Sequence, residues 1–214
     1  MNNKTLNPES IPFSGHNQLV VFARPPVPGK VKTRLAREVG DDKAAQIYRE
    51  LLDHAFQMIE SLPKDIKCAI AWDNSNNNRA EYTKHHRWIQ PSGNLGEKMS
   101  WAISHSIEKG AGKAMIIGTD CPTITLSTIT DAFQTLDNAE VVLGPAEDGG
   151  YYLVGAKQVI PALFPDLQWG NNLVLQETIK SLENAGISYS LLDLKYDIDT
   201  WDDWKRWQQT ITNK

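Results

Sequence analysis

The sequence has only two cysteines, Cys68 and Cys121, among its 214 residues. A disulfide framework or a zinc site would need more ligands than these, and the five histidines show no ligand spacing with either cysteine. We therefore expect a reducing compartment, with the cytoplasm as the default location. No apolar run reaches the length of about 18 residues that a membrane span needs, and residues 1–17 lack the apolar centre of a signal peptide.

Positive charge is also scarce, because 22 Lys and Arg residues stand against 26 Asp and Glu residues. A nucleic-acid-binding surface would need a basic excess, so we expect small molecules as partners and no nucleic acid. The composition, with 41% hydrophobic residues, is ordinary for a soluble globular chain long enough to bury one substantial core. We expect a flexible tail over residues 1–17 and a single domain over residues 18–214, and we leave the oligomeric state open.

Short apolar runs alternate with amphipathic stretches after this tail, and the two patterns predict strands and helices respectively. The runs predict strands over residues 19–23, 66–72, 114–118, 141–143, 151–154 and 187–194. Apolar periodicity predicts helices over 44–59, 95–107, 129–136 and 175–182, and a last helix that begins at a Thr200 cap. Strands alternating with helices predict an α/β sandwich around a mostly parallel sheet, while the close strands at 141–143 and 151–154 indicate an antiparallel element. We expect Ser127 to cap the third helix and a polar loop over residues 73–78.

The first stretch whose residues suggest a chemical function is residues 24–37, which we call the basic segment. It contains no acidic residue. Its cations are Arg24, Lys30, Lys32, Arg34 and Arg37. Such crowding suits a polyphosphate ligand, and Gly29 would let backbone amides approach it closely. The segment is not a P-loop, because Arg24 and Val31 stand where that motif needs Gly and Ser or Thr. The alternative is a solvated loop of exposed cations that contribute little to folding.

Three aspartates form a second group, which we call the acid cluster: Asp120, Asp197 and Asp199. Asp120 follows the end of a predicted strand, and the other two are spaced to share one face of extended backbone while Ile198 faces the other way. An all-oxygen donor set selects Mg²⁺ or Mn²⁺ over zinc. The alternatives are an ordinary turn at Asp120 and capping of the last helix by the later pair.

A glycine-rich turn over residues 145–152 is the third group. Asp148 precedes two glycines there and is able to accept hydrogen bonds from hydroxyl groups, although a plain turn between strands explains the same residues. Trp169, in a Gly/Asn-rich loop, is expected to line an acceptor pocket. We expect Cys121 to be a packing residue rather than a nucleophile.

These motifs occur in an order that resembles a bacterial family labelled as glycosyltransferases, formerly a domain of unknown function, in the nucleotide-diphospho-sugar transferase (GT-A) superfamily. The resemblance covers about residues 18–207. It rests on FARPP at 22–26, GKVKTRL at 29–35, NLGEKM at 94–99, GTDCP at 118–122, PAEDGGYY at 145–152 and DIDT at 197–200. It implies a single GT-A-like, Rossmann-like domain, a three-layer α/β/α sandwich with a mostly parallel mixed sheet. One departure is WGNN at 169–172, where the family usually has Trp followed by Ser-Thr.

The chain is also similar, more distantly, to the 2-phospho-lactate and molybdenum cofactor guanylyltransferases, which use Mg²⁺ to move a nucleotidyl group. Taken with the residue patterns, the resemblance implies catalytic roles for Asp120, Asp199 and Lys32, and metal binding by Asp120, Asp197 and Asp199. It implies nucleotide and phosphate binding by Arg24, Gly29, Lys30, Lys32, Arg34, Gly96 and Thr119. It implies substrate binding by Asp148, Gly149, Gly150, Tyr151 and Trp169.

Three functions are consistent with these residues. The first is metal-dependent glycosyl transfer from a nucleotide-diphospho-sugar donor to an unknown acceptor. The second is nucleotidyl transfer from a nucleoside triphosphate to a phosphate or carboxylate acceptor. The basic segment suits both donors, because each carries a polyphosphate. The third is a non-catalytic nucleotide-binding protein, which the acid cluster disfavours because neighbouring carboxylates repel unless a cation compensates them.

Overall fold

The structure is a computed structural model that describes residues 15–73 and 86–212. Most of the expected tail, and all but the first residue of the expected polar loop over 73–78, lie outside these residues. Within them, seven strands form one sheet in the order β3-β2-β1-β4-β6-β5-β7. The strands are β1 (His16–Ala23), β2 (Ile66–Trp72), β3 (His86–Ile89), β4 (Ala111–Ile117), β5 (Val141–Pro145), β6 (Tyr151–Ala156) and β7 (Tyr189–Leu191). Only β6 runs antiparallel to its neighbours, so the predicted mostly parallel mixed sheet is confirmed.

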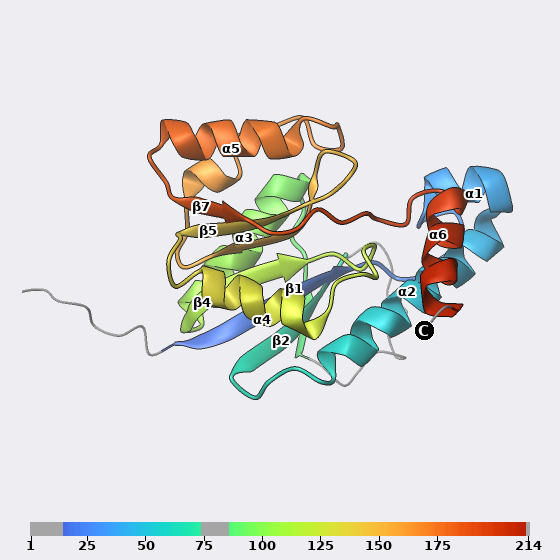
Figure 1. Ribbon diagram of the computed structural model, residues 1–214, viewed down its shortest axis with the longest axis horizontal. Helices are drawn as coiled ribbons and strands as arrows, with labels where there is room; N and C mark the ends of the chain where they lie inside the picture. The colour runs from blue at the N-terminus through green and yellow to red at the C-terminus, as the bar shows by residue number, and fades with distance from the viewer. Residues whose placement is uncertain (1–14, 74–85, 213–214) are drawn as a thin grey trace, which may run out of the picture.

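Helices cover both faces of this sheet and complete three layers (Figure 1). They are α1 (Thr33–Val39), α2 (Asp41–Ile59), α3 (Leu95–Glu108), α4 (Leu126–Thr135), α5 (Val174–Asn184) and α6 (Trp201–Thr212), with a short 3-10 turn at Pro161–Leu163. The α/β sandwich predicted from the sequence is therefore confirmed.

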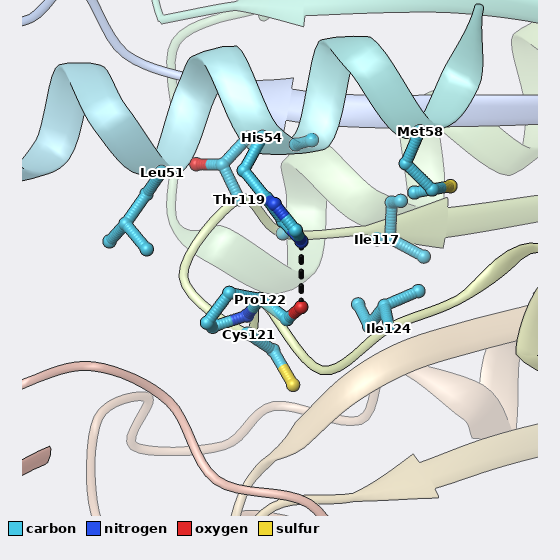
Figure 2. Close-up of a pocket in the computed structure, with 10 residues that line it drawn as sticks. Leu51, His54, Met58, Ile117, Thr119, Cys121, Pro122 and Ile124 are labelled. Atoms are coloured by element: carbon cyan, nitrogen blue, oxygen red, sulfur yellow. Dashed lines mark hydrogen bonds between the residues drawn. The ribbon is translucent and has the colours of Figure 1, made fainter. Parts of the chain in front are cut away.

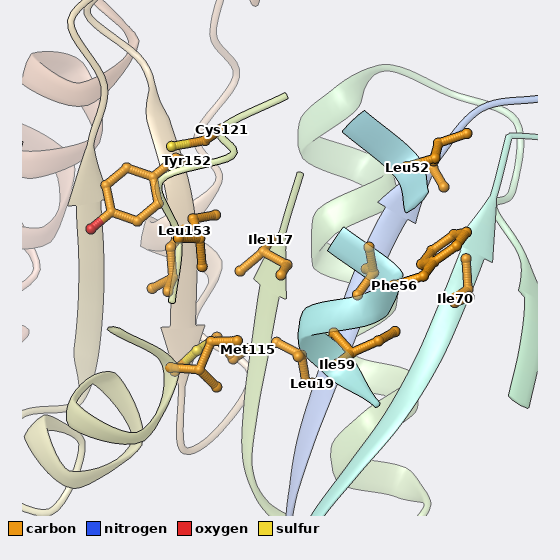
Figure 3. Close-up of a cluster of buried hydrophobic side chains, with 14 of the residues drawn as sticks. Leu19, Leu52, Phe56, Ile59, Ile70, Met115, Ile117, Cys121, Tyr152 and Leu153 are labelled. Atoms are coloured by element: carbon orange, nitrogen blue, oxygen red, sulfur yellow. The ribbon is translucent and has the colours of Figure 1, made fainter. Parts of the chain in front are cut away.

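Alternation along the strands divides the core between the two faces. In β1, Leu19 and Val21 pack with α2 and α4, while Val20 packs with α3 and α5. Figure 3 shows the first of these clusters, in which Leu52 and Phe56 of α2 contact the sheet. The apolar residues of α2 recur at helical spacing, which gives this helix one continuous buried stripe.

A third cluster joins α6 to α1 and α2 beyond the end of β1, where Figure 1 shows α6 beside α1. Trp204 and Trp207 of α6 pack there with Leu35 of α1 and with Ile198, the residue between two aspartates of the acid cluster. The periodic tryptophans thus dock the last helix onto the core. This docking also fixes the backbone that carries Asp197 and Asp199.

Four local expectations differ from the structure. Part of the basic segment is not loop but helix α1, which is anchored by the single buried residue Leu35. Strand β3 was not predicted because its four residues are mostly exposed and show no apolar alternation. The last strand is confined to Tyr189–Leu191, and the chain then runs extended toward Thr200, with one further bridge at Lys195.

The fourth difference is the cap of α4, which was expected at Ser127. The cap is Thr125, whose hydroxyl accepts from the backbone of Thr128, while the Thr128 hydroxyl accepts from the Thr125 backbone N–H. The cap therefore lies two residues earlier than expected, and Ser127 lies inside the first turn of the helix.

The docking of α6 generates a stability prediction. Trp204 is 6% exposed and its ring lies 5.1 Å from that of Trp207, so Trp204→Ala should lower the free energy of unfolding by about 3–5 kcal/mol. Ile211→Ala on the same helix is the matched control, because Ile211 is 48% exposed and should change the free energy by less than about 1 kcal/mol. Urea unfolding measures both, and equal effects would contradict the docking role of Trp204.

Candidate active site

Three backbone segments meet at the carboxyl end of the central strands. The backbone N–H of Ile198 donates to the carbonyl of Asp120 at 2.8 Å, which joins the last extended segment to the turn after β4. Tyr48 of α2 ties the same region together, because its hydroxyl accepts from the backbone of Arg24 at 2.9 Å and from the Thr119 hydroxyl at 3.2 Å. The ends of β1 and β4 and the segment before α6 are thus held in fixed register.

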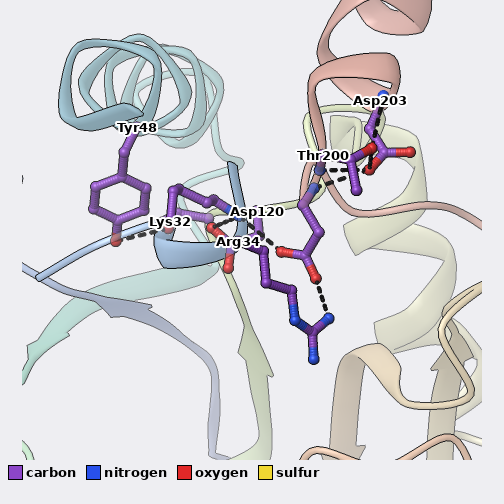
Figure 4. Close-up of polar contacts among 8 residues, drawn as sticks. Lys32, Arg34, Tyr48, Asp120, Thr200 and Asp203 are labelled. Atoms are coloured by element: carbon purple, nitrogen blue, oxygen red, sulfur yellow. Dashed lines mark hydrogen bonds and ion pairs between the residues drawn. The ribbon is translucent and has the colours of Figure 1, made fainter. Parts of the chain in front are cut away.

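Lys32 lies at the centre of this junction (Figure 4). Its ammonium is 2.8 Å from Asp120 Oδ1 and 3.4 Å from Asp199 Oδ1, and its side chain is only 4% exposed. Burial alone would lower the pKa of Lys32, but the carboxylates of Asp120 and Asp199 outweigh it and raise that pKa. The alternative of a solvated loop of exposed cations therefore does not hold for Lys32, which is a buried partner of the acid cluster.

Arg34 contacts the acid cluster from the solvent side. One of its terminal nitrogens lies 3.0 Å from Asp199 Oδ2, and its side chain is 62% exposed. The two oxygens of Asp199 therefore face different cations, Oδ1 toward Lys32 and Oδ2 toward Arg34. The basic segment and the acid cluster form one ionic network, in which Arg34 and Asp199 are 165 residues apart in the chain.

Asp197 completes the acid cluster on the more buried side. Burial, followed by the nearby Asp120 carboxylate, raises the pKa of Asp197 to about 7, although Lys32 acts in the opposite direction. Ile198 is fully buried between the two aspartates, as their spacing predicted. Asp120 and Asp199 thus contact the Lys32 ammonium directly, and Asp197 is close enough to raise the pKa of Lys32 without such a contact.

Helix capping does not account for the side chain of Asp199. The start of α6 is capped by Thr200 and Asp203: the Thr200 backbone N–H donates to Asp203 Oδ2 at 2.8 Å, and the Asp203 backbone N–H donates to the Thr200 hydroxyl at 3.3 Å. This pair is a capping box, and it confirms the cap predicted at Thr200. The carboxylate of Asp199 takes no part in this cap and instead contacts Lys32 and Arg34 of the basic segment.

Across residues 15–73 and 86–212, no three His, Cys, Asp or Glu side chains are arranged to hold a metal ion. The acid cluster is instead arranged around the ammonium of Lys32. Its donor set is nevertheless the one that Mg²⁺ and Mn²⁺ prefer, because it consists of carboxylate oxygens alone. The residues fit such an ion chemically, and the metal assignment stays a prediction.

Two further charged residues were not identified from the sequence. Asp73 follows β2, the neighbour of β1, and lies 3.5 Å from Arg24 and 4.0 Å from the ammonium of Lys98 on α3. Asp73 follows the end of a buried strand, as Asp120 does, so the same sequence pattern could have identified it as a candidate site residue. Asp73 therefore pairs with Arg24, the first cation of the basic segment. The next cation, Lys30, is exposed in the turn beside Gly29.

The glycine-rich turn packs against the loop before α5. Gly149 has a φ of +88°, and a Cβ there would lie 2.1 Å from the carbonyl oxygen of Asn172, so only glycine fits. Asp148 Oδ1 accepts from the backbone of Gly150 at 2.9 Å, which is a turn-forming contact, and the Asp148 side chain remains exposed. Arg206 of α6 binds this turn, because its guanidinium donates bidentate hydrogen bonds to the Glu147 carboxylate at 3.0–3.2 Å.

Trp169, Gly96 and Tyr151 form one contact group, which we call the aromatic wall. A Cβ on Gly96 would lie 2.4 Å from the indole of Trp169, so the ring packs directly on the first turn of α3. The ring of Tyr151 meets Trp169 edge-on at 6.5 Å. Gly96, which is predicted to contact the nucleotide, is therefore buried against the ring of Trp169, which is predicted to line the acceptor pocket.

A small apolar hollow lies behind the turn that carries Asp120 (Figure 2). His54, Thr119 and Cys121 are among the residues that line it, and His54 Nε2 is 2.9 Å from the carbonyl oxygen of Pro122. The space is about that of one water molecule, too small for a nucleotide. Burial raises the pKa of Cys121 to about 11, in keeping with the packing role expected for this residue.

Burial of Asp197, reinforced by the neighbouring Asp120 carboxylate, predicts that this residue lowers the stability of the fold. Between about pH 4 and pH 7 the folded protein binds a proton at Asp197 that the unfolded chain has lost, so stability falls as the pH rises through this window. Asp197→Asn should therefore raise the melting temperature by roughly 2–4 °C at about pH 8, equivalent to about 1 kcal/mol, and by less at about pH 5. Asp131→Asn, at an exposed position on α4, is the control, and a pH-independent gain in Asp197→Asn would contradict the account.

No helix in the described parts of the chain is long and apolar enough to cross a membrane. The chain is 30% identical to a crystal structure from Desulfovibrio desulfuricans G20, described as a candidate nucleotide-diphospho-sugar transferase. That match has a TM-score of 0.80 and covers 86% of this chain and 82% of the other. A search of curated proteins gave no match.

More distant structures share the fold. The 4-diphosphocytidyl-2C-methyl-D-erythritol synthase of Anaerococcus prevotii DSM 20548 aligns with a TM-score of 0.62 at 9% identity, over 94% of this chain and 98% of that one. A CMP:2-keto-3-deoxy-manno-octonic acid synthetase complexed with CTP aligns with a TM-score of 0.52 at 12% identity, over 92% and 99% of the two chains. The fold is thus that of the nucleotide-diphospho-sugar transferases, as the resemblance implied.

The family model described as "Uncharacterized protein conserved in bacteria" (DUF2064) matches residues 61–171. This match covers three of the motifs on which the sequence resemblance rests: the segment 94–99, the turn with Asp120 and the glycine-rich turn. Together with the relative at 30% identity, it shows that the chain belongs to this bacterial family.

Proposed function

We propose that this protein is a nucleotide-using transferase, dependent on Mg²⁺ or Mn²⁺, that moves a glycosyl group from a nucleotide-diphospho-sugar to a small-molecule acceptor. The observation that carries the proposal is the meeting of the basic segment and the acid cluster at one point. Lys32 and Arg34 both contact Asp199 there, and Lys32 also contacts Asp120. Such a junction offers cations for phosphates and carboxylates for a metal within the same few ångströms.

The charge balance at this junction favours a divalent cation. Three carboxylates in the acid cluster face two cations, and the carboxylate of Asp148 is close enough to act on Asp197. Once Asp197 has lost its proton, above about pH 7, the junction therefore has an excess of negative charge that a hard divalent cation would neutralise. Asp120 and Asp199 are the proposed first ligands, because both are partly open to solvent, and Asp197 supports them from the buried side.

The basic segment supplies the complementary charge. Arg24, Lys30 and Arg34 have exposed side chains that would bind the diphosphate of the donor, and Lys32 would add a fourth cation. When the glycosyl bond breaks, negative charge grows on the departing nucleoside diphosphate, and positive groups held in place stabilise it. A bound metal would add Lewis-acid stabilisation of the same phosphates.

The acceptor side is proposed at the aromatic wall and the glycine-rich turn. Trp169 and Tyr151 offer ring faces and edges, and the exposed Asp148 offers a hydrogen-bond acceptor for a hydroxyl group. The 30% identity to the D. desulfuricans protein supports the sugar donor. The cytoplasm remains the expected location.

Nucleotidyl transfer is the second candidate, and the number of cations favours it. Arg24, Lys30, Lys32 and Arg34 together carry more positive charge than a diphosphate needs, as a triphosphate with a pyrophosphate leaving group would require. The products separate the two reactions, because glycosyl transfer releases a nucleoside diphosphate and nucleotidyl transfer releases pyrophosphate.

The test is a matched panel of nucleotide-sugars and nucleoside triphosphates with Mg²⁺, Mn²⁺ or a chelator. A donor at about 100 times its Kd should raise the stability of the protein by roughly 2.7 kcal/mol, which a thermal shift detects. Stabilisation by nucleotide-sugars supports the proposal, while stabilisation by triphosphates alone would favour the second candidate. Binding without turnover of any donor would favour a non-catalytic nucleotide-binding protein.

The acid cluster gives the sharpest activity prediction. Asp199→Asn should reduce metal-dependent turnover by at least about 100-fold, because the substitution keeps the shape of the side chain but removes its charge from the junction. Folding should be nearly normal, since Thr200 and Asp203 cap α6 without the Asp199 carboxylate. Asp202→Asn, at an exposed position on the same helix, is the control, and full activity of Asp199→Asn would exclude Asp199 as a metal ligand.

A further inference from the structure

The backbone of Lys32 has an uncommon conformation. Its φ of 48° and ψ of 45° are left-handed, and within residues 15–73 and 86–212 it is the one non-glycine residue with a positive φ. The flanking contacts hold it there: Val31 and Leu35 are buried, and the Lys32 carbonyl accepts from the backbone of Ala36 at 2.8 Å. Such strain in a non-glycine residue persists only where the surroundings enforce it, and it tends to occur at functional sites.

This conformation directs the ammonium between the two proposed metal ligands. Nζ lies 2.8 Å from Asp120 Oδ1 and 3.4 Å from Asp199 Oδ1, while Arg34 takes the second oxygen of Asp199. The oxygens that a metal would use are therefore occupied by cations of the basic segment. Equally, the cations that donor phosphates would use are occupied by the acid cluster.

We propose that Lys32 is an exchangeable internal counter-ion, which occupies the cation position in the ligand-free protein and is displaced when a divalent cation binds. The proposal rests on the proposed function, because it assumes that Asp120 and Asp199 bind the metal. A divalent ion bound to the same two oxygens would lie within about 5 Å of the ammonium, where the two positive charges repel each other strongly in so enclosed a position. The ammonium must then move, and the donor phosphates are the nearest anions that it would meet.

This exchange couples the two ligands. A metal on the acid cluster frees Lys32 for phosphate, and a phosphate that attracts Lys32 frees the carboxylates for the metal. By thermodynamic linkage, each ligand raises the affinity of the other by the same factor. Lys32 thereby disfavours metal binding in the absence of a nucleotide.

The test compares Mn²⁺ binding to the wild type, Lys32→Met and Lys30→Met without nucleotide, by electron paramagnetic resonance. Lys32→Met should bind Mn²⁺ roughly tenfold more tightly than the wild type, because the competing ammonium is gone. Lys30→Met removes the same charge from the same segment but from an exposed side chain, so it should gain less than about threefold. Unchanged or weaker binding in Lys32→Met would overturn the exchange and leave the metal site standing.

Absence of Mn²⁺ binding in all three proteins would instead overturn the metal site itself, and the exchange with it. A second measurement remains decisive if Lys32→Met is unstable, because the uncompensated acid cluster should make this variant depend on the metal. Mn²⁺ should then raise the melting temperature of Lys32→Met by more than it raises that of Lys30→Met. An equal rise in both variants would contradict the proposal.

Discussion

The ion pairs between Lys32 and the carboxylates of Asp120 and Asp199 are the interaction on which the candidate site depends. They join the segment after β1, the turn after β4 and the segment before α6, which lie far apart in the sequence. A buried ammonium is tolerated only where anions compensate it, and several clustered carboxylates are tolerated only where cations do. The buried Lys32 ammonium and the clustered carboxylates are therefore each tolerated only because the other is present.

The rest of the fold serves to hold this junction in place. The parallel strands β1 and β4 bring their carboxyl ends side by side, and Tyr48 joins these ends through its hydroxyl. On the far side, the tryptophans of α6 bury Ile198 and so fix the aspartates that flank it. Arg206 extends the same support to the glycine-rich turn through Glu147.

Much of this could be predicted from the sequence, because the apolar patterns reflect burial directly. The layers, the antiparallel strand β6, the cap at Thr200 and the convergence of Asp120 with Asp199 all follow from local patterns and from where parallel strands end. What could not be predicted depends on contacts over long distances. Lys32 is buried against Asp120 and Asp199, the second of which is 167 residues away, and no local signal separates Lys32 from the exposed Lys30. The contact of Trp169 with Gly96 likewise joins two loops that look independent in the sequence.

The central claim is that the junction of the basic segment and the acid cluster binds a divalent cation together with a nucleotide. Anomalous X-ray diffraction at the manganese edge tests it most directly, on crystals grown with Mn²⁺ and a nucleoside diphosphate. The account predicts one manganese peak within about 2.0–2.3 Å of oxygens from Asp120 and Asp199, with the Lys32 ammonium moved onto a phosphate. A peak elsewhere, or a nucleotide bound while Lys32 keeps both of its carboxylate partners, would contradict it.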